Sequence, residues 1–164
     1  MTVAGYRLPF LLLGGFRRVV DEAHRRLAAE GVHVDIRPTH GFTMQAVGDG
    51  ATVSDVGRAL GISKQAAAKT VESLLERGYL ERVEDPGDAR RKVLRPTAHG
   101  RDLLTASARV FDEVYVELGE RLGPDRVESL REDLEVLAGD QAYRIDGISW
   151  FGAPDSSLLR DSPS

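Results

Sequence analysis

The chain has 164 residues, of which 41% are hydrophobic and 29% are charged, and its net charge is −4. This length predicts one domain of ordinary size, and the composition is typical of a globular protein. Because the chain has no cysteine, disulfides, thiolate nucleophiles and cysteine-ligated zinc are excluded.

The N-terminal part of the chain predicts one long helix and one short helix. The apolar run Leu8–Leu13 is far shorter than the roughly 20 residues that span a bilayer, so we expect no membrane segment and a cytoplasmic location. Apolar side chains recur at helical spacing over residues 9–31, which predicts a helix that starts near Pro9 and stops at Gly31. A short helix over residues 40–47 follows, with Thr39 as its N-cap.

Residues 52–78 have the pattern of two short helices joined by a tight turn. Thr52 and Asp55 have the spacing of a capping box at the start of the first helix, and Gly61 ends that helix. Ser63 is placed to cap the second helix, which Gly78 stops. A turn of about three residues containing glycine between two helices is the helix-turn-helix arrangement.

A basic hairpin is predicted next. Tyr79–Val83 and Lys92–Arg95 read as strands around an acidic turn, and Pro96 ends the second strand. Residues 53–96 hold nine Lys and Arg against seven Asp and Glu, whereas the rest of the chain is acidic. Any case for a polyanionic partner must therefore rest on where the cations lie and not on net charge.

The C-terminal third predicts two more helices. Thr97 is placed to cap a long helix over about residues 98–122, and residues 123–125 break it before a last helix over 125–138. We expect the apolar stripes of both helices, among them Phe111, Tyr115 and Leu134, to point inward. Residues 139–164 are rich in Gly, Ser, Asp and Pro and predict a partly ordered extension.

In this order the elements resemble the MarR family of winged helix-turn-helix transcription regulators over about residues 8–138. The most specific part is residues 52–100, with Leu60-Gly61-Ile62-Ser63, then Glu76-Arg77-Gly78-Tyr79-Leu80, then Asp85-Pro86-Gly87-Asp88-Ala89-Arg90, and then Pro96-Thr97 followed by Gly100. Family members usually have leucine where Pro96 stands.

The resemblance implies a mainly α fold with a small two- to three-stranded β-wing, dimeric through its N- and C-terminal helices. It divides the chain into an N-terminal dimerisation helix (1–36), a DNA-binding winged helix-turn-helix (37–97), C-terminal dimerisation helices (98–138) and the extension (139–164). It also implies a regulator, most simply a repressor, that binds a pseudo-palindromic operator as a homodimer.

The expected partner is double-stranded DNA, whose major groove receives the second helix of a helix-turn-helix and whose minor groove receives wing arginines. The candidate DNA-binding residues are Ser63, Lys64, Gln65, Ala66, Lys69 and Thr70 on the second helix, Asp88, Arg90, Arg91 and Lys92 on the wing, and Thr39 and His40 on the short helix. Arg90 is the stronger wing candidate by its similarity to the family, and we expect Asp88 to orient it.

The resemblance further implies a small aromatic or phenolic ligand between the dimer region and the DNA-binding lobe. The candidate ligand-binding residues are Phe16, His40, Phe42, Met44 and Phe111, although core packing is the simpler explanation for each of them. We expect no cofactor, no metal and no enzymatic activity, because the four histidines lack i, i+4 metal spacing and no Gly-rich phosphate loop is present. Two alternatives stay open: a winged helix that binds protein, and a metal-responsive regulator using His24, His40 and His99 with Glu22 or Glu30.

Overall fold

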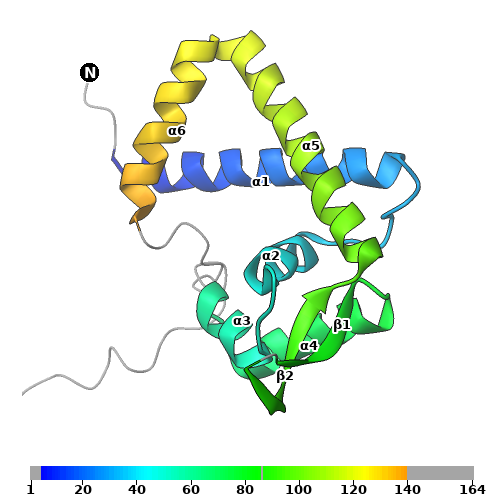
Figure 1. Ribbon diagram of the computed structural model, residues 1–164. Coiled ribbons are helices and arrows are strands. Elements are labelled where there is room, and N and C mark those ends of the chain that lie inside the picture. The colour runs from blue at the N-terminus through cyan, green and yellow to red at the C-terminus, as the bar shows by residue number, and fades with distance from the viewer. Residues whose placement is uncertain (1–4, 86, 140–164) are drawn as a thin grey trace, which may run out of the picture.

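The structure, a computed structural model, describes residues 5–85 and 87–139, and the predicted extension therefore lies almost wholly outside the described residues. The elements are α1 (Arg7–Ala29), α2 (Pro38–Val47), α3 (Val53–Leu60), α4 (Lys64–Glu76), β1 (Leu80–Asp85), β2 (Asp88–Pro96), α5 (Ala98–Leu122) and α6 (Pro124–Ala138). Figure 1 shows α1, α5 and α6 together on one side of the molecule and the lobe from α2 to β2 on the other. The predicted mainly α fold with a small wing is confirmed.

Local capping signals fix most of the helix boundaries. The backbone N–H of Asp55 donates to Thr52 Oγ1 over 3.2 Å, and that of Thr52 donates to Asp55 Oδ2 over 3.0 Å, which completes the expected capping box. The backbone N–H of Ala66 donates to Ser63 Oγ over 3.1 Å, so Ser63 caps α4 as predicted. Each cap satisfies helix donors that would otherwise have no partner.

Two helix starts differ from the prediction. Helix α1 begins at Arg7, so that Pro9 lies inside the first turn, where its missing N–H costs no helix hydrogen bond. Helix α2 begins at Pro38 after the extended Arg37, because the fixed φ of proline suits the first helical position. Thr39 is therefore within the helix and is not its cap.

The wing is a two-stranded antiparallel hairpin in which Leu80 pairs with Pro96 and Val83 pairs with Val93. A third partner is reduced to one residue, Ala51, whose N–H donates to the carbonyl of Leu94 over 3.2 Å and whose carbonyl accepts in return over 2.8 Å. This bridge joins the base of the wing to the segment that enters α3.

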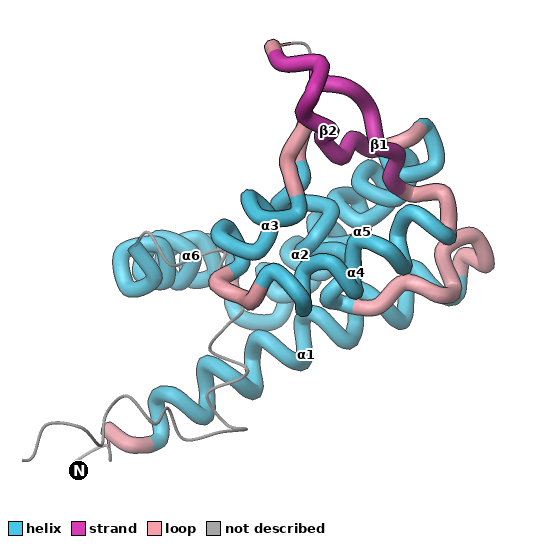
Figure 2. Tube along the Cα trace, turned by 90° about the horizontal axis from the view of Figure 1, so that it is seen from below, coloured by secondary structure: helices cyan, strands magenta, loops and turns pink. Residues whose placement is uncertain are grey.

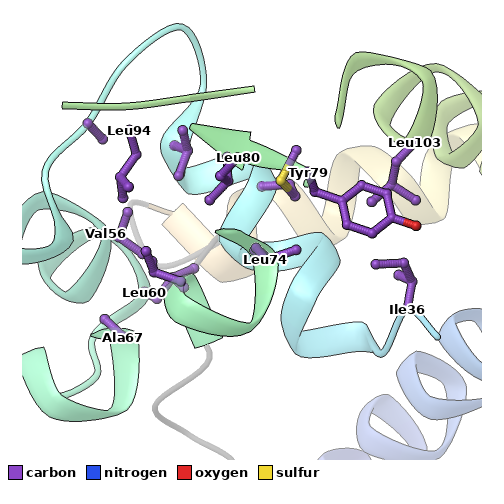
Figure 3. Close-up of a cluster of buried hydrophobic side chains, with 13 residues drawn as sticks. Ile36, Val56, Leu60, Ala67, Leu74, Tyr79, Leu80, Leu94 and Leu103 are labelled. Carbon is purple, nitrogen blue, oxygen red and sulfur yellow. The ribbon is translucent and has the colours of Figure 1, made fainter. Parts of the chain in front are cut away.

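The lobe from α2 to β2 has its own apolar core, which Figure 3 shows in close-up. Met44, Val71 and Leu74 are completely buried there, and Tyr79 lies among them with only 4% of its surface exposed. Helix α5 contributes Leu103 to the same cluster. The first turns of α5 therefore belong to the core of the lobe from α2 to β2, although the rest of the helix leaves it.

A second, smaller core joins α1 to α5 through Ala23, Leu27 and Val110. Ion pairs reinforce the contact: Arg26 Nη2 lies 2.6 Å from Glu117 Oε2, and Arg26 Nε lies 2.7 Å from Glu22 Oε1. None of the described helices has an apolar stretch long enough to cross a membrane.

The expected inward stripes of α5 and α6 are only partly buried in the single chain. On α5, Leu103 and Val114 are buried as predicted, whereas Phe111 and Tyr115 are exposed. On α6, Val127 is buried, but Leu130 is 47% exposed and Leu134 is 37% exposed. The reason is that α6 packs mainly on α5, so that much of the surface of its other apolar side chains stays exposed.

Candidate nucleic-acid interface

Helix α4 presents a continuous polar face outside the lobe. Ala67, Val71 and Leu74 fasten the helix to the core with their completely buried side chains. The outward positions are Ser63, Lys64, Gln65, Ala66 and Lys69, all exposed, and Thr70, which is half-buried. Thr70 Oγ1 donates to the carbonyl of Ala66 over 3.4 Å, so part of its hydrogen-bonding capacity is used within the helix.

The turn between α3 and α4 fixes the angle at which this face is presented. Gly61 has a φ of +67°, a conformation that favours glycine, and the N–H of Ile62 donates to the carbonyl of Gly57 over 2.9 Å. A side chain at Gly57 would place its Cβ 3.1 Å from the carbonyl of Ile62. The close approach of the two helices therefore depends on both glycines. Figure 2 shows α3, α4 and the wing together on the face turned toward the viewer.

Arg90 lies at the far end of the wing with its guanidinium exposed. Asp88 Oδ1 accepts a hydrogen bond from the backbone N–H of Arg90 over 3.0 Å, which shapes the turn from which the arginine projects. Within the described ranges, neither Arg90 nor the exposed Lys92 forms an ion pair with a carboxylate of the chain. Both cations are therefore available to an external anion.

Arg91 has a different environment from its neighbour. Its Nη2 lies 3.1 Å from Asp55 Oδ2 on α3, and its Nε lies 3.6 Å from Asp85 Oδ2 on β1. Hydrogen bonds from Thr52 are the main reason that the pKa of Asp55 falls to about 2, and Arg91 and Arg58 lower it further. Asp55 is thus a fixed anion, and Arg91 serves first to hold the wing against α3.

A second ion pair holds the wing to α4, because Arg82 Nη2 lies 3.1 Å from Glu72 Oε2. Asp55, Glu72 and Arg82 position the interface, a role that the sequence pattern did not predict. The capping box had identified Asp55 as a helix cap, but no local signal joins it to Arg91 across 36 positions.

The two candidates on α2 are placed differently from each other. Thr39 is exposed on the first turn of the helix. His40 is only 6% exposed, and its Nδ1 accepts a hydrogen bond from the backbone N–H of Arg37 over 3.1 Å. Burial lowers the pKa of His40, and the nearby Arg77 and Arg37 lower it further. The ring of His40 therefore closes the N-terminus of α2 and leaves almost no surface for a phosphate or a ligand.

Three of the candidate ligand-binding residues do come together. Phe42, Met44 and Phe111 line a cavity of about 110 Å³ between α1, α2 and α5. Phe16 stacks on Phe42 with 6.1 Å between ring centroids, outside the cavity lining, and His40 is absent from the lining as well. An open cavity of about 450 Å³ lies beside it at the base of the wing, where it is lined by Gln45, Asp49, Arg95 and Arg101 among others.

The histidines do not gather carboxylates around them. Over residues 5–85 and 87–139, no group of three or more His, Cys, Asp or Glu side chains is arranged to hold a metal ion. His24 Nδ1 lies 2.8 Å from the carbonyl of Val20 within α1, and His99 stacks on Tyr79. The set proposed for a metal-responsive regulator is thus divided among separate sites.

A two-helix unit with a tight glycine turn, a polar recognition face and a basic hairpin after it defines a winged helix-turn-helix protein. Residues 42–91 match the model of the MarR family. This match, which runs from within α2 through α3, α4 and β1 into β2, supports a place for the chain in the MarR family of winged-helix transcription regulators.

Solved structures have the same fold as this chain, and one curated protein is similar to it in sequence. A MarR-family regulator from Rhodococcus sp. RHA1 has the same fold, with a TM-score of 0.66 and 21% identity over 85% of this chain and 97% of that one. CouR from Rhodococcus jostii RHA1, solved with p-coumaroyl-CoA, gives a TM-score of 0.65 and 22% identity over 85% and 96%. The LexA repressor of Deinococcus radiodurans is 30% identical over 124 residues, 72% of this chain, which spans only 57% of that protein's length.

Proposed function

We propose that the protein is a DNA-binding repressor that acts as a homodimer on a pseudo-palindromic operator. The observation that carries the proposal has two parts: an exposed polar face on α4, and an exposed Arg90 that pairs with no carboxylate of the described residues. The wing that carries Arg90 is joined by ion pairs to both α3 and α4. A rigid pair of this kind suits one helix in a major groove and one arginine in the adjacent minor groove. The similarity to a repressor supports the direction of regulation.

Each side chain on this surface has a separate proposed role. Gln65 has the geometry for paired hydrogen bonds to adenine, and Lys64 and Lys69 reach guanine or phosphate. Ser63 and the N-terminus of α4 offer donors to a phosphate. Arg91, already engaged with Asp55, contributes mainly by fixing the wing.

Dimerisation is proposed from the apolar side chains that the single chain leaves uncovered. Residues 1–36 and 98–138 are assigned to the dimer, and residues 37–97 to DNA binding. The uncovered side chains include Leu8, Phe10 and Leu11 on α1, Tyr115 and Val116 on α5, and Leu130, Leu134 and Leu137 on α6. So many large apolar groups at the surface of one lobe mark a protein interface. A second copy would place two α4 helices on successive major grooves, about 10 base pairs apart.

Ligand control is proposed from the cavity between α1, α2 and α5. Its volume of about 110 Å³ is below the usual range for ligand sites, which begins at roughly 300 Å³. An aromatic or phenolic ligand would therefore have to open the cavity, and in doing so would change the spacing between α5 and the DNA-binding lobe. The bound p-coumaroyl-CoA of the similar CouR supports a ligand of this general kind.

The test is DNA binding by the full chain to a duplex selected from a random library. We expect the logarithm of affinity to fall linearly with the logarithm of salt concentration, because phosphate contacts release counterions. Arg90→Ala should weaken binding by about 1–3 kcal/mol while the dimer persists in sedimentation. The matched control is Arg126→Ala, which removes an exposed arginine on α6. Salt-independent binding, or unchanged affinity in Arg90→Ala, would contradict the proposal and favour a protein-binding winged helix.

A further inference from the structure

Three aromatic side chains with titratable groups meet inside the protein, away from the DNA-facing surface. His33 Nδ1 lies 3.0 Å from the hydroxyl of Tyr79. The ring of His99 stacks on Tyr79 with 4.3 Å between centroids and lies 5.1 Å from the ring of His33. We call His33, Tyr79 and His99 the histidine–tyrosine cluster. Neither the proposed DNA contacts nor the ligand cavity uses it.

The cluster lies where three segments of the chain meet. His33 belongs to the connector between α1 and α2, Tyr79 links α4 to β1, and His99 is in the first turn of α5. The backbone at Tyr79 is held in place, because its carbonyl accepts from the N–H of Thr97 over 3.1 Å. The cluster is thus the joint between the long helices and the lobe that carries α4 and the wing.

The joint favours an uncharged His33. This residue is only 4% exposed, and burial is the main cause that lowers its pKa, followed by the neighbouring imidazole of His99. Burial also raises the pKa of the Tyr79 hydroxyl. The Tyr79 hydroxyl can donate to a neutral imidazole or accept from a charged one, so the hydrogen bond itself does not prevent protonation. Protonation of His33 is unfavourable because it buries a cation beside a second imidazole.

Charged groups on the surrounding elements only partly offset this cost. Glu30 at the end of α1 and Asp102 on α5 favour the protonated form of His33. Glu30, however, is paired with Arg109. Asp35 of the connector is paired with Arg77 at the end of α4, with 3.1 Å between Arg77 Nη1 and Asp35 Oδ2. The carboxylates nearest the joint on α1 and the connector are therefore committed to arginines.

We propose that the histidine–tyrosine cluster is a pH-sensitive joint, which opens when His33 takes up a proton below neutral pH and thereby weakens DNA binding. The sign follows from linkage. A histidine with a lowered pKa in the closed joint keeps that joint stable above the ordinary value of about 6.5. As the pH falls below that value, the open form gains the proton first, and the ratio of closed to open joint falls by up to about tenfold per pH unit.

The direction of this effect is diagnostic. Acidification makes the protein surface more positive, and more positive charge by itself strengthens binding to DNA phosphates. A loss of affinity on acidification therefore needs a structural cause. The measurement of DNA affinity rests on the proposed function, whereas the titration of His33 does not. A failure of the proposed DNA-binding function can therefore be distinguished from a failure of the pH-sensitive joint.

The first experiment is a ring-proton NMR titration of the full chain between pH 8 and pH 5. The chain has four histidines, whose signals are assigned by single substitutions. We expect the His33 signal to titrate with a midpoint below about 6.5, and the Tyr79 ring signals to shift over the same range. A His33 midpoint at or above about 6.5, or Tyr79 signals that ignore it, would overturn the proposal.

The second experiment follows affinity for the library-selected duplex at pH 7.5 and pH 5.5. We expect the wild type to lose at least about threefold in affinity and His33→Gln, which keeps a hydrogen-bonding side chain but cannot titrate, to lose none. The matched control is His40→Gln, because His40 is also buried with a lowered pKa but lies outside the cluster. The proposal would be refuted if His33→Gln still lost affinity at pH 5.5, or if only His40→Gln abolished that loss of affinity. Tyr79→Phe adds a check: it should leave the His33 midpoint low, since burial is its main cause.

Discussion

Gly100 in the first turn of α5 is the position where one added methyl group should do the most damage. A Cβ at this residue would lie 2.1 Å from the carbonyl oxygen of Tyr79 and 3.0 Å from the Cε of Met44. Backbone oxygen cannot move aside as the end of a side chain can. The same Tyr79 oxygen accepts the N–H of Thr97, so any shift that relieves the contact also disturbs the α5 cap.

The expected loss in free energy of unfolding is about 3 kcal/mol for Gly100→Ala. Overpacking of this kind costs roughly 1–3 kcal/mol or more, and losing a hydrogen bond adds about 1 kcal/mol, whereas alanine returns about 1 kcal/mol in helix propensity. For a chain of this size such a loss lowers the melting temperature by roughly 6–12 °C. Thermal unfolding followed by circular dichroism at a fixed protein concentration measures it.

The matched control is Gly41→Ala, because Gly41 is also inside a helix but a Cβ there meets nothing within 4 Å. Without a clash, only helix propensity changes, and we expect a gain of up to about 1 kcal/mol. If Gly100→Ala melts within about 2 °C of the wild type, the close approach of α5 to Tyr79 is not a feature of the folded protein.

Two further predictions concern the cap that anchors the wing and the core beneath α4. Asp55→Asn should cost about 1 kcal/mol through the lost capping box and should loosen the wing by freeing Arg91. Because the folded pKa of Asp55 is about 2, below its ordinary value of 3.8, this contribution is complete above about pH 4 and is lost as the pH falls to 2. Melting temperatures of the two proteins should therefore converge over that range, and a constant difference would contradict the assignment. Leu74→Ala, at a completely buried position, should cost about 2–5 kcal/mol in urea unfolding, and a loss below about 1 kcal/mol would show that α4 is not anchored there.

The sequence was a good guide wherever a boundary depends on residues a few positions apart. Thr52 with Asp55, and Ser63 with Ala66, form the caps that their spacing predicts. Gly61 has the positive φ expected at a helix end. These features need only the local chain, because a cap hydrogen bond closes within one helical turn. The element order and the helix-turn-helix followed from them.

Sequence reasoning was weaker wherever burial depends on what a helix packs against. Periodicity identified the apolar stripes of α5 and α6, but it placed Phe111 and Leu134 in the interior of the chain, whereas both are exposed. A stripe that faces its own core and a stripe that faces another molecule have the same spacing. The burial of His40 could not be predicted for a related reason, since a histidine near a helix start is equally compatible with an exposed contact and with a buried cap.

The wing shows how two adjacent residues of the same type acquire different roles. By residue type and position alone, Arg90 and Arg91 are similar cations at the tip of a basic hairpin, and only the family resemblance favours Arg90. In the fold, neighbouring residues of a strand point to opposite faces, so one arginine turns back to Asp55 while the other stays exposed. Arg91 fixes the wing through its ion pair with Asp55 and is therefore less available to DNA, whereas Arg90 is held in position for a contact. We expect Arg90→Ala and Arg91→Ala both to weaken DNA binding, the first by removing a contact and the second by loosening the wing.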